Sequence, residues 1–192
     1  MIMRFHTHQK SDVYFDNTVN QCSTYALSQY IPNTSFYVYL KELDNYSFHS
    51  AIAAGISIVW PATDSVFDLN RAKTLSEQYL SIRHILNGDW YPLTEYSRSL
   101  ESWLGSQYHR SDLNEGIVLL FRREKCAMQT IRIKLNELDR EAAYCLESYT
   151  TGRTIQINGS TLSDGFDITI DNLPGSELIV YRKLNVKKEI RI

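Results

Sequence analysis

The stretch GISIVWP at residues 55–61 is a short run rich in β-branched residues that ends at a proline, which predicts a buried strand. A helix is predicted to follow it, with Asp68 as N-cap and Asn87-Gly88 as the stop signal. Between these limits, apolar residues recur every three or four positions, at Ala72, Leu75, Tyr79, Ile82 and Leu86. A strand followed by an amphipathic helix is the repeating unit of parallel α/β folds.

The chain before this stretch continues the same pattern. Residues 21–27 are compatible with a short helix, residues 29–32 with the end of another strand, and residues 46–54 with a second helix. Residues 1–88 are therefore predicted to be α/β. Two or three such units cannot close a parallel barrel, which takes eight strands and about 250 residues. We therefore expect a missing N-terminal half, a partner chain or self-association to cover the open strand edges.

Residues 89–192 have the patterns of an all-β domain. Apolar continuity or alternation predicts strands at residues 116–121, 131–135, 144–149, 154–157, 166–171 and 177–181. Turns are predicted at Asn158-Gly159 and at Pro174-Gly175. Several short strands with regular turns predict an antiparallel β-sandwich.

Composition narrows the class of protein. The net charge of −2 argues against nucleic acid or an anionic membrane as the main partner, and no apolar run approaches the roughly 20 residues of a membrane span. The three cysteines include no CxxC pair and predict reduced thiols in a cytoplasmic protein. The aromatic content of 12% suits stacking against sugars, but it suits β-sheets equally well.

One segment resembles a known family. GDWYPLT at residues 88–94 is followed by Ser102-Trp103, by QYHRSDL at residues 107–113 and by FRR at residues 121–123. This order and spacing resemble the junction of barrel and C-terminal domain in α-galactosidase-like glycoside hydrolases of family 36. Upstream, KSDVYFD, QCSTY and DNYSFHS, which begin at residues 10, 21 and 44, resemble segments of the same family.

The resemblance implies a fold with two parts. Residues 1–88 would be the C-terminal part of a TIM (β/α)8 barrel, and residues 89–192 an antiparallel β-sandwich domain. It also implies catalytic chemistry, because the aspartate of the family's Ser-Asp pair is the general acid/base and matches Asp12. Retaining hydrolysis needs a second carboxyl group about 5–5.5 Å away, which the family places on an earlier strand. The isolated chain is therefore expected to be inactive.

Other residues are candidates for substrate binding. Asp16, four residues after Asp12, is a candidate neighbour of the acid/base. Trp60 ends the predicted strand at residues 55–61, and Tyr30 lies at the end of the preceding one; both are candidates to stack under a sugar, since barrel sites lie at the carboxyl ends of strands. A solvated loop acid is the alternative for Asp12, and a core or rim aromatic is the alternative for each ring.

No metal or cofactor is implied. His6 and His8 form an HxH pair, but no third ligand follows at a fixed spacing. Two functions remain open. The first is part of a hydrolase that acts on an oligosaccharide or other α-galactoside. The second is a non-catalytic β module that binds carbohydrate or stabilises a barrel.

Overall fold

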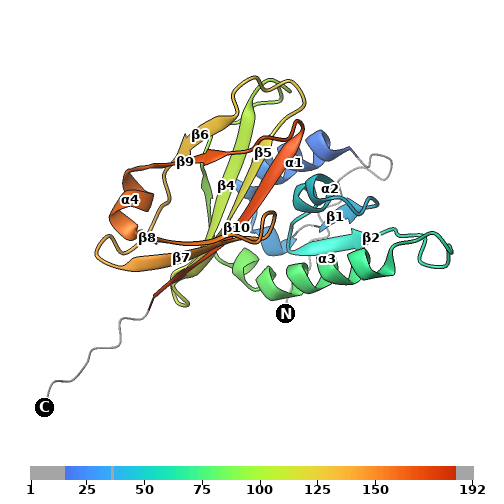
Figure 1. The fold of residues 1–192 in the computed structure, drawn as a ribbon, viewed down its shortest axis with the longest axis horizontal. Coiled ribbons are helices and arrows are strands. Elements are labelled where there is room, and N and C mark those ends of the chain that lie inside the picture. The colour runs from blue at the N-terminus through green and yellow to red at the C-terminus, as the bar shows by residue number, and fades with distance from the viewer. Residues whose placement is uncertain (1–15, 36, 185–192) are drawn as a thin grey trace, which may run out of the picture.

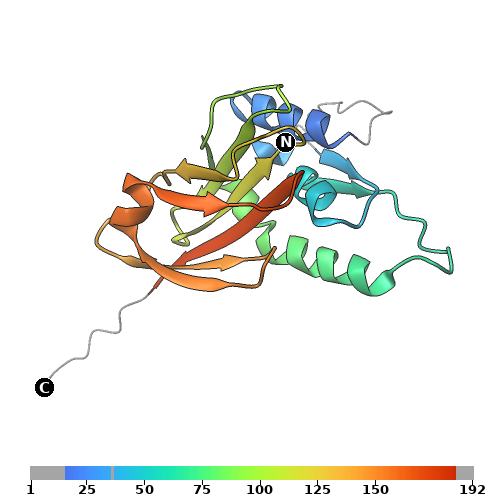
Figure 2. The same cartoon turned by 45° about the horizontal axis from the view of Figure 1, so that its top comes forward.

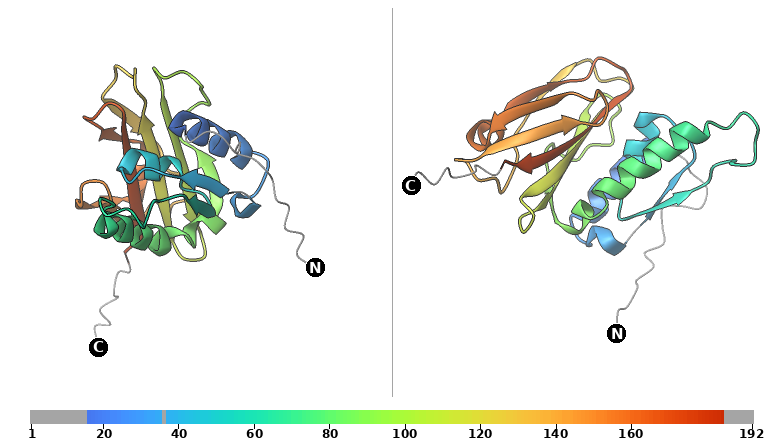
Figure 3. Two further views of the ribbon diagram at one scale, coloured as in Figure 1. Left: turned by 90° about the vertical axis from the view of Figure 1, so that its right-hand side faces the viewer. Right: turned by 60° about the horizontal axis from the view of Figure 1, so that its bottom comes forward.

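A computed structural model describes residues 16–35 and 37–184 (Figure 1). Three helices and a pair of parallel strands lie on one side of the molecule, and antiparallel strands form the other side (Figure 3). The helices are α1 (Asn17–Ser28), α2 (Asn45–Ser50) and α3 (Leu69–Ile82), with 3-10 turns η1 (Asn33–Ser35) and η2 (Ile85–Asn87). The domain boundary predicted between residues 88 and 89 stays a prediction, because the two sides share a core.

The parallel strands β1 (Tyr37–Leu40) and β2 (Gly55–Ile58) pair with Val38 opposite Ile56. Helix α2 connects them, and α3 follows β2. The carboxylate of Asp68 accepts a hydrogen bond from Arg71 N, so the predicted N-cap of α3 is confirmed. Ala72, Leu75 and Ile82 form the buried stripe of this helix, as the periodicity predicts.

The antiparallel part is built on a six-stranded sheet of order β3-β4-β5-β10-β7-β8, with a two-stranded sheet β6-β9 beside it. A short helix, α4 (Gly159–Asp164), joins β8 to β9. The strands are β3 (Asp89–Pro92), β4 (Trp103–Arg110), β5 (Glu115–Arg122), β6 (Thr130–Ile133), β7 (Ala143–Ser148), β8 (Thr154–Asn158), β9 (Phe166–Thr169) and β10 (Gly175–Lys183). The prediction of an antiparallel β domain is confirmed.

The six-stranded sheet is buried on both faces at its centre. On one face, Leu119 and Leu178 belong to a cluster that includes Val38 and Leu75 from the parallel side. On the other face, Val118 belongs to a second cluster that β6, β9 and α4 complete (Figure 2). Alternate residues of β5 therefore enter different cores, which explains why its sequence is a continuous apolar run.

Three local predictions are wrong. The strand end predicted at residues 29–32 is the C-cap of α1 and a turn, and the strand comes later, at β1. Asn158-Gly159 does not turn a hairpin, because Asn158 is the N-cap of α4 and Gly159 its first residue. A Cβ on Gly159 would lie 2.0 Å from Asp139 O, so close backbone approach explains the glycine. Strand β2 forms as predicted but is not buried, because it pairs with a single strand among the described residues and leaves Ile58 49% exposed.

The remaining sequence expectations concern thiols and membranes. All three cysteines are free thiols, with Cys22 and Cys126 buried and Cys145 partly exposed. Within residues 16–35 and 37–184, no helix has the length and apolar character needed to cross a membrane. The assignment of residues 1–88 to a (β/α)8 barrel stays a prediction, since the described part contains one parallel strand pair.

Candidate functional site

The carboxyl ends of β1 and β2 lie at one edge, because the two strands are parallel. Lys41 and Glu42 follow β1, and Val59 and Trp60 follow β2. Val59 N donates a hydrogen bond to Leu40 O over 2.9 Å, which extends the pairing to this edge. We call these residues the carboxyl edge. In α/β folds, this is where functional side chains gather.

A small hollow lies at the carboxyl edge. It has a volume of about 40 Å³ and is bounded by the first turns of α1, by the end of β1 and by Ser47 of α2. Asn17 Nδ2 donates to Ser47 Oγ over 3.0 Å, which joins α1 to α2 beside the hollow. The side chains of Lys41 and Glu42 pair at 3.8 Å and are more than half exposed. Amides, an ammonium and a carboxylate therefore meet at one place, a set that can hydrogen-bond sugar hydroxyls.

The loop between β1 and α2 is held in place from α3. Asp44 caps α2, and its carboxylate accepts a hydrogen bond from Ser47 N over 2.8 Å. Arg71 Nε donates to Leu43 O over 3.0 Å, and Arg71 Nη2 donates to Asn45 Oδ1. The loop that carries Lys41 and Glu42 is thus fixed by a guanidinium with two partners, which reduces the ordering that a ligand would have to impose.

Trp60 lies at the carboxyl edge, as the sequence predicts. Its side chain is half-buried, and its ring centroid lies 6.0 Å from that of Phe67 at an interplanar angle of 44°. Its indole Nε1 is buried and lacks a hydrogen-bond partner within the described residues. The Trp60 ring therefore packs beside Phe67, and its indole N–H has no hydrogen-bond partner within the described residues. The role of Trp60 in sugar binding stays a prediction.

Tyr30 does not join Trp60. It follows α1 and precedes β1, so it lies toward the amino end of that strand, away from the carboxyl edge. Its side chain is 83% exposed, and the neighbouring Asn33 is buried with its Oδ1 accepting from Ser28 Oγ. The premise that Tyr30 ends a strand is wrong, because this residue lies in the turn that follows the C-cap of α1. A binding role for Tyr30 remains a prediction without that support.

Asp16 has a structural function in this fold. Its Oδ1 accepts a hydrogen bond from Val19 N over 2.9 Å and caps α1. Asp12, His6 and His8 lie outside the described residues. Among residues 16–35 and 37–184, no group of three His, Cys, Asp or Glu side chains could hold a metal ion.

We expect Asp16→Ala to lower the free energy of unfolding by about 1 kcal/mol, because an N-cap hydrogen bond is lost. Asp16→Ser should retain most of the stability, since serine caps a helix equally well. Urea denaturation of the three proteins measures the difference. Equal losses in both variants would show that the carboxylate acts by something other than capping.

The carboxyl edge depends on an anchor between α1 and the antiparallel sheet. Arg123, directly after β5, is fully buried, and its Nε donates to Gln21 Oε1 over 3.1 Å. Its Nη1 donates to Ser97 O over 2.7 Å and to Ser99 O over 3.0 Å. Its Nη2 lies 3.2 Å from Cys22 Sγ. One guanidinium therefore joins α1, the β3–β4 connection and β5.

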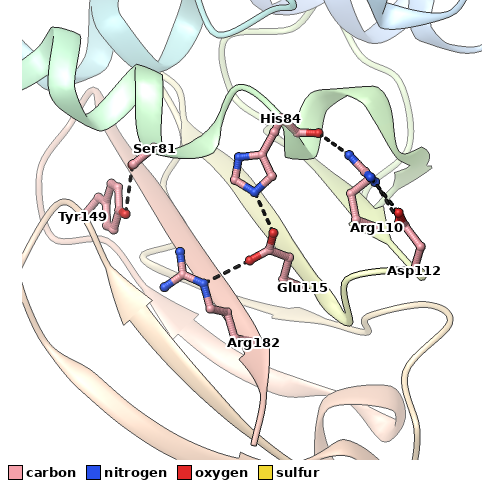
Figure 4. A network of polar contacts seen from close by, with 7 residues as sticks. All are labelled: Ser81, His84, Arg110, Asp112, Glu115, Tyr149 and Arg182. Carbon is pink, nitrogen blue, oxygen red and sulfur yellow. Dashed lines mark hydrogen bonds and ion pairs between the residues drawn. The ribbon is translucent and has the colours of Figure 1, made fainter.

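A second anchor joins the end of α3 to the sheet (Figure 4). His84 Nε2 lies 2.6 Å from Glu115 Oε1, and Arg182 Nε donates to Glu115 Oε2 over 3.0 Å. Burial raises the pKa of Glu115, but hydrogen bonds from His84 and Arg182 outweigh it and leave that pKa below its ordinary value. Arg110 Nη1 donates to His84 O over 2.8 Å and pairs with Asp112 on its other side. The two anchors fix the parallel strands relative to the β domain.

Sequence reasoning missed part of this site. Lys41 and Glu42 escaped because β1 itself was missed, and Asn17 escaped because the helix was predicted to begin only at residue 21, whereas α1 begins at Asn17. The alternation in YVYL at residues 37–40, with Val38 and Leu40 buried and Tyr37 exposed, is the signal that could have revealed it.

Comparison with known proteins identifies the fold. No family model matches the chain, and no curated protein matches it. Among solved structures, the family 36 α-galactosidase AgaA of Geobacillus stearothermophilus aligns at 15% identity with a TM-score of 0.71, over 88% of this chain and 25% of its own length. The galactosidase domain of the α-galactosidase-sucrose kinase AgaSK aligns at 15% identity and a TM-score of 0.69, with the same coverage.

The α-galactosidase of Lactobacillus brevis aligns at 13% identity with a TM-score of 0.68, over 90% of this chain and 25% of its own. Variants of AgaA have been solved in complex with raffinose and with stachyose. This chain thus spans about a quarter of the length of the structures it matches. At such low identity, the likeness shows that the chain has the sheet-rich fold of part of these α-galactosidases.

Proposed function

We propose that this chain is the C-terminal part of a family 36-type, α-galactosidase-like glycoside hydrolase of the cytoplasm, with an oligosaccharide or other α-galactoside as substrate. The observation that carries the proposal is the order of elements. A parallel strand pair with its helices leads directly into an antiparallel sheet, and the whole arrangement aligns with family 36 α-galactosidases over 88% of the chain. The motifs at residues 88–123 support the same assignment from the sequence.

In this proposal β1 and β2 are the last strands of a (β/α)8 barrel. Their parallel register supports it, as does the burial of Val38 and Leu40 toward the helices and the sheet. Tyr37 and Tyr39 alternate with these residues and would face the barrel interior. Their ring centroids lie 5.7 Å apart in an edge-to-face arrangement. Earlier barrel strands would pair with the open edges of the two strands.

The carboxyl edge would form one side of the substrate site. Asp12, four residues before the cap of α1, would be the general acid/base, and Trp60 would stack under a sugar, with Asp16 as the nearest candidate for a supporting contact. The nucleophile would come from an earlier strand. Because double displacement needs both carboxyl groups, the chain by itself should not hydrolyse a glycoside. The reaction requires neither a metal nor a cofactor.

The test adds the missing barrel strands. The polypeptide encoded immediately upstream is produced with this chain, and release of p-nitrophenol from p-nitrophenyl α-galactoside is measured. We expect hydrolysis only when both parts are present. Asp12→Asn should then reduce the rate at least about a hundredfold, while Asp171→Asn, an exposed residue in the antiparallel part, should not change it. Full activity of Asp12→Asn would refute its role as acid/base.

A second candidate is a non-catalytic module that stabilises a barrel. The observation in its favour is that both faces of the six-stranded sheet are covered and that two polar anchors connect it to the parallel strands. On this alternative, adding the upstream polypeptide would raise thermal stability and yield no hydrolysis. The same pair of samples therefore distinguishes the two functions.

A further inference from the structure

Strand β8 forms an open edge of the six-stranded sheet. It pairs with β7 on one side and with no other strand among residues 16–35 and 37–184. All of its residues are exposed except Ile157, which is partly buried, so no described helix or loop covers this edge. An uncovered edge strand presents its backbone N–H and C=O groups to any strand that approaches.

Hydrogen bonds just beyond the two ends of β8 show which of its backbone groups point toward β7. Ser148 N donates to Arg153 O over 2.8 Å, and Gly159 N donates to Ala142 O over 2.7 Å. Backbone groups alternate in direction along an antiparallel strand. Every second residue between Arg153 and Gly159 therefore bonds to β7 as well.

The intervening residues point the other way. The N–H and C=O groups of Thr154 and Gln156, and the N–H of Asn158, face the open side of β8. These groups have no backbone or side-chain partner in the described part of the chain. Strand β8 can therefore form hydrogen bonds with a further strand without losing any that it makes to β7.

The opposite edge of the sheet is protected, and β8 is not. Strand β3 begins at Asp89, which is charged, and ends at Pro92, which has no N–H to donate. A charge or a proline on an edge strand prevents pairing with another chain. Strand β8 contains neither, and the side chain of Ile155 is 52% exposed. The features that would keep a second chain away are therefore missing from β8.

The sequence of β8 is complementary to itself. In an antiparallel pair of two copies centred on Gln156, this residue lies opposite its own counterpart, and Thr154 lies opposite Asn158. Their outward backbone groups can then bond across the pair. Ile155 lies opposite Ile157, at the positions between hydrogen-bonded pairs where side chains approach most closely. Polar residues thus meet polar residues, and isoleucines meet isoleucines.

The side chains also favour this register over its neighbour. Centring the pair on Ile155 instead would place the charged Arg153 opposite Ile157 of the second copy. In the register centred on Gln156, the isoleucines of both copies form one apolar row. Ile157 already packs against the core cluster that includes Val118, so this row extends that core from one copy to the other.

We propose that β8 is a dimerisation edge, which pairs antiparallel with β8 of a second copy and joins the two six-stranded sheets into one. A second copy is the partner because the strand is its own complement. Strand β8 belongs to the antiparallel part, whereas earlier barrel strands would pair with β1 and β2 on the other side of the molecule (Figure 3). The dimer should therefore form with or without the upstream polypeptide.

The test is sedimentation equilibrium of the full chain from about 10 μM to about 1 mM, where a weak interface of this small size should associate. We expect a dimer with a dissociation constant on the order of 100 μM, because a strand of five residues contributes few contacts. Hydrogen exchange over the same range locates the contact. The amides of Thr154 and Gln156 should exchange roughly fourfold more slowly at the highest concentration, whereas those of Ile155 and Ile157, already bonded to β7, should change less.

Two variants of β8 test the pairing in different ways. Gln156→Pro removes an outward N–H and leaves the bonds to β7 intact, and it should weaken the dimer at least about tenfold. Ile155→Lys leaves the backbone unchanged and places a charge opposite Ile157 of the second copy, with a similar effect expected. Leu80→Lys is the matched control, since Leu80 is 55% exposed on α3 and its replacement should leave the dissociation constant unchanged.

Several results would overturn the proposal. A monomer at every concentration would do so, as would a dimer of unchanged affinity in both β8 variants. Equal weakening by Leu80→Lys would show that loss of apolar surface anywhere has the same effect. Unchanged exchange at Thr154 and Gln156 in the dimer would place the contact elsewhere, as at the open edges of β1 and β2. Hydrolysis by the completed protein is a separate readout, so the catalytic proposal can stand if β8 does not pair.

Discussion

Replacing Arg123 with alanine is expected to lower the free energy of unfolding by about 3–5 kcal/mol. The side chain is fully buried and donates to Gln21 Oε1, Ser97 O and Ser99 O. Alanine would leave the buried Gln21 Oε1 without this donor, would remove one of the donors to Ser97 O and to Ser99 O, and would open a cavity between α1 and β5. No carboxylate is a hydrogen-bond partner of this guanidinium within the described residues, so the loss would come from the lost hydrogen bonds and from packing.

The measurement is chemical denaturation, combined with hydrogen exchange. Arg123→Lys keeps the positive charge but not the planar guanidinium with its several N–H donors. Its free energy of unfolding should lie between those of the parent protein and Arg123→Ala. Arg153→Ala is the control, because Arg153 is exposed and such changes stay within about 0.5 kcal/mol. Amides of α1 should exchange faster in Arg123→Ala than those of β10, since the anchor holds that helix on the sheet. A decrease of less than about 1 kcal/mol in the free energy of unfolding would contradict this role. Amide exchange that rises by the same factor in α1 and β10 would contradict it as well.

A helix can be predicted from the sequence where a capping residue marks its end. Asp68 bonds to Arg71 N at the start of α3, and a buried stripe follows it, so local pattern and structure agree. Strand β4 has no such signal. Both of its faces are buried, and it contains Gln107 and His109, whose polar atoms bond to Tyr181 OH and, for Gln107, also to Asn136 O. A polar residue inside a buried strand becomes favourable only with partners that are distant in sequence.

The candidate site shows the same limit. The resemblance to a known family supplied Asp12, and the proline after β2 marked Trp60, but the anchors could not be predicted. Arg123 and Gln21 are 102 residues apart, and Arg182 and Glu115 are 67 apart. Nothing in the local pattern of either partner indicates the other. Lys41 and Glu42 were missed for a simpler reason, since a four-residue strand gives too short an alternation to stand out.

Acid should destabilise this fold through His49. The imidazole is 1% exposed, and its Nδ1 lies 2.8 Å from Ser176 Oγ of β10. Burial, and to a lesser degree the charge of Arg71, lowers the pKa of His49 to about 3, while Asp44 acts in the opposite direction. In the unfolded chain the same group takes up a proton near pH 6.5. Stability from this residue is therefore complete above about pH 6.5 and is lost as the pH falls toward 3, by several kcal/mol in all.

Other buried groups modify this curve. Burial also lowers the pKa of His109, so that residue adds to the loss in acid. Burial raises the pKa of Glu177, despite hydrogen bonds from Ser148 and Thr150 that lower it. A raised carboxyl pKa favours the folded state as the pH falls through that value, so Glu177 opposes the two histidines.

His49→Asn isolates the contribution of His49, because an amide can still bond to Ser176 Oγ but does not titrate. The variant should be less stable than the parent protein at pH 7, since the smaller side chain leaves a cavity. Between pH 6 and pH 4, its free energy of unfolding should fall less steeply, by about 1.4 kcal/mol per pH unit. Urea denaturation at several pH values gives both slopes. Parallel curves for the two proteins would mean that His49 takes up its proton in the folded state as readily as in the unfolded chain, and that its burial does not control the response to acid.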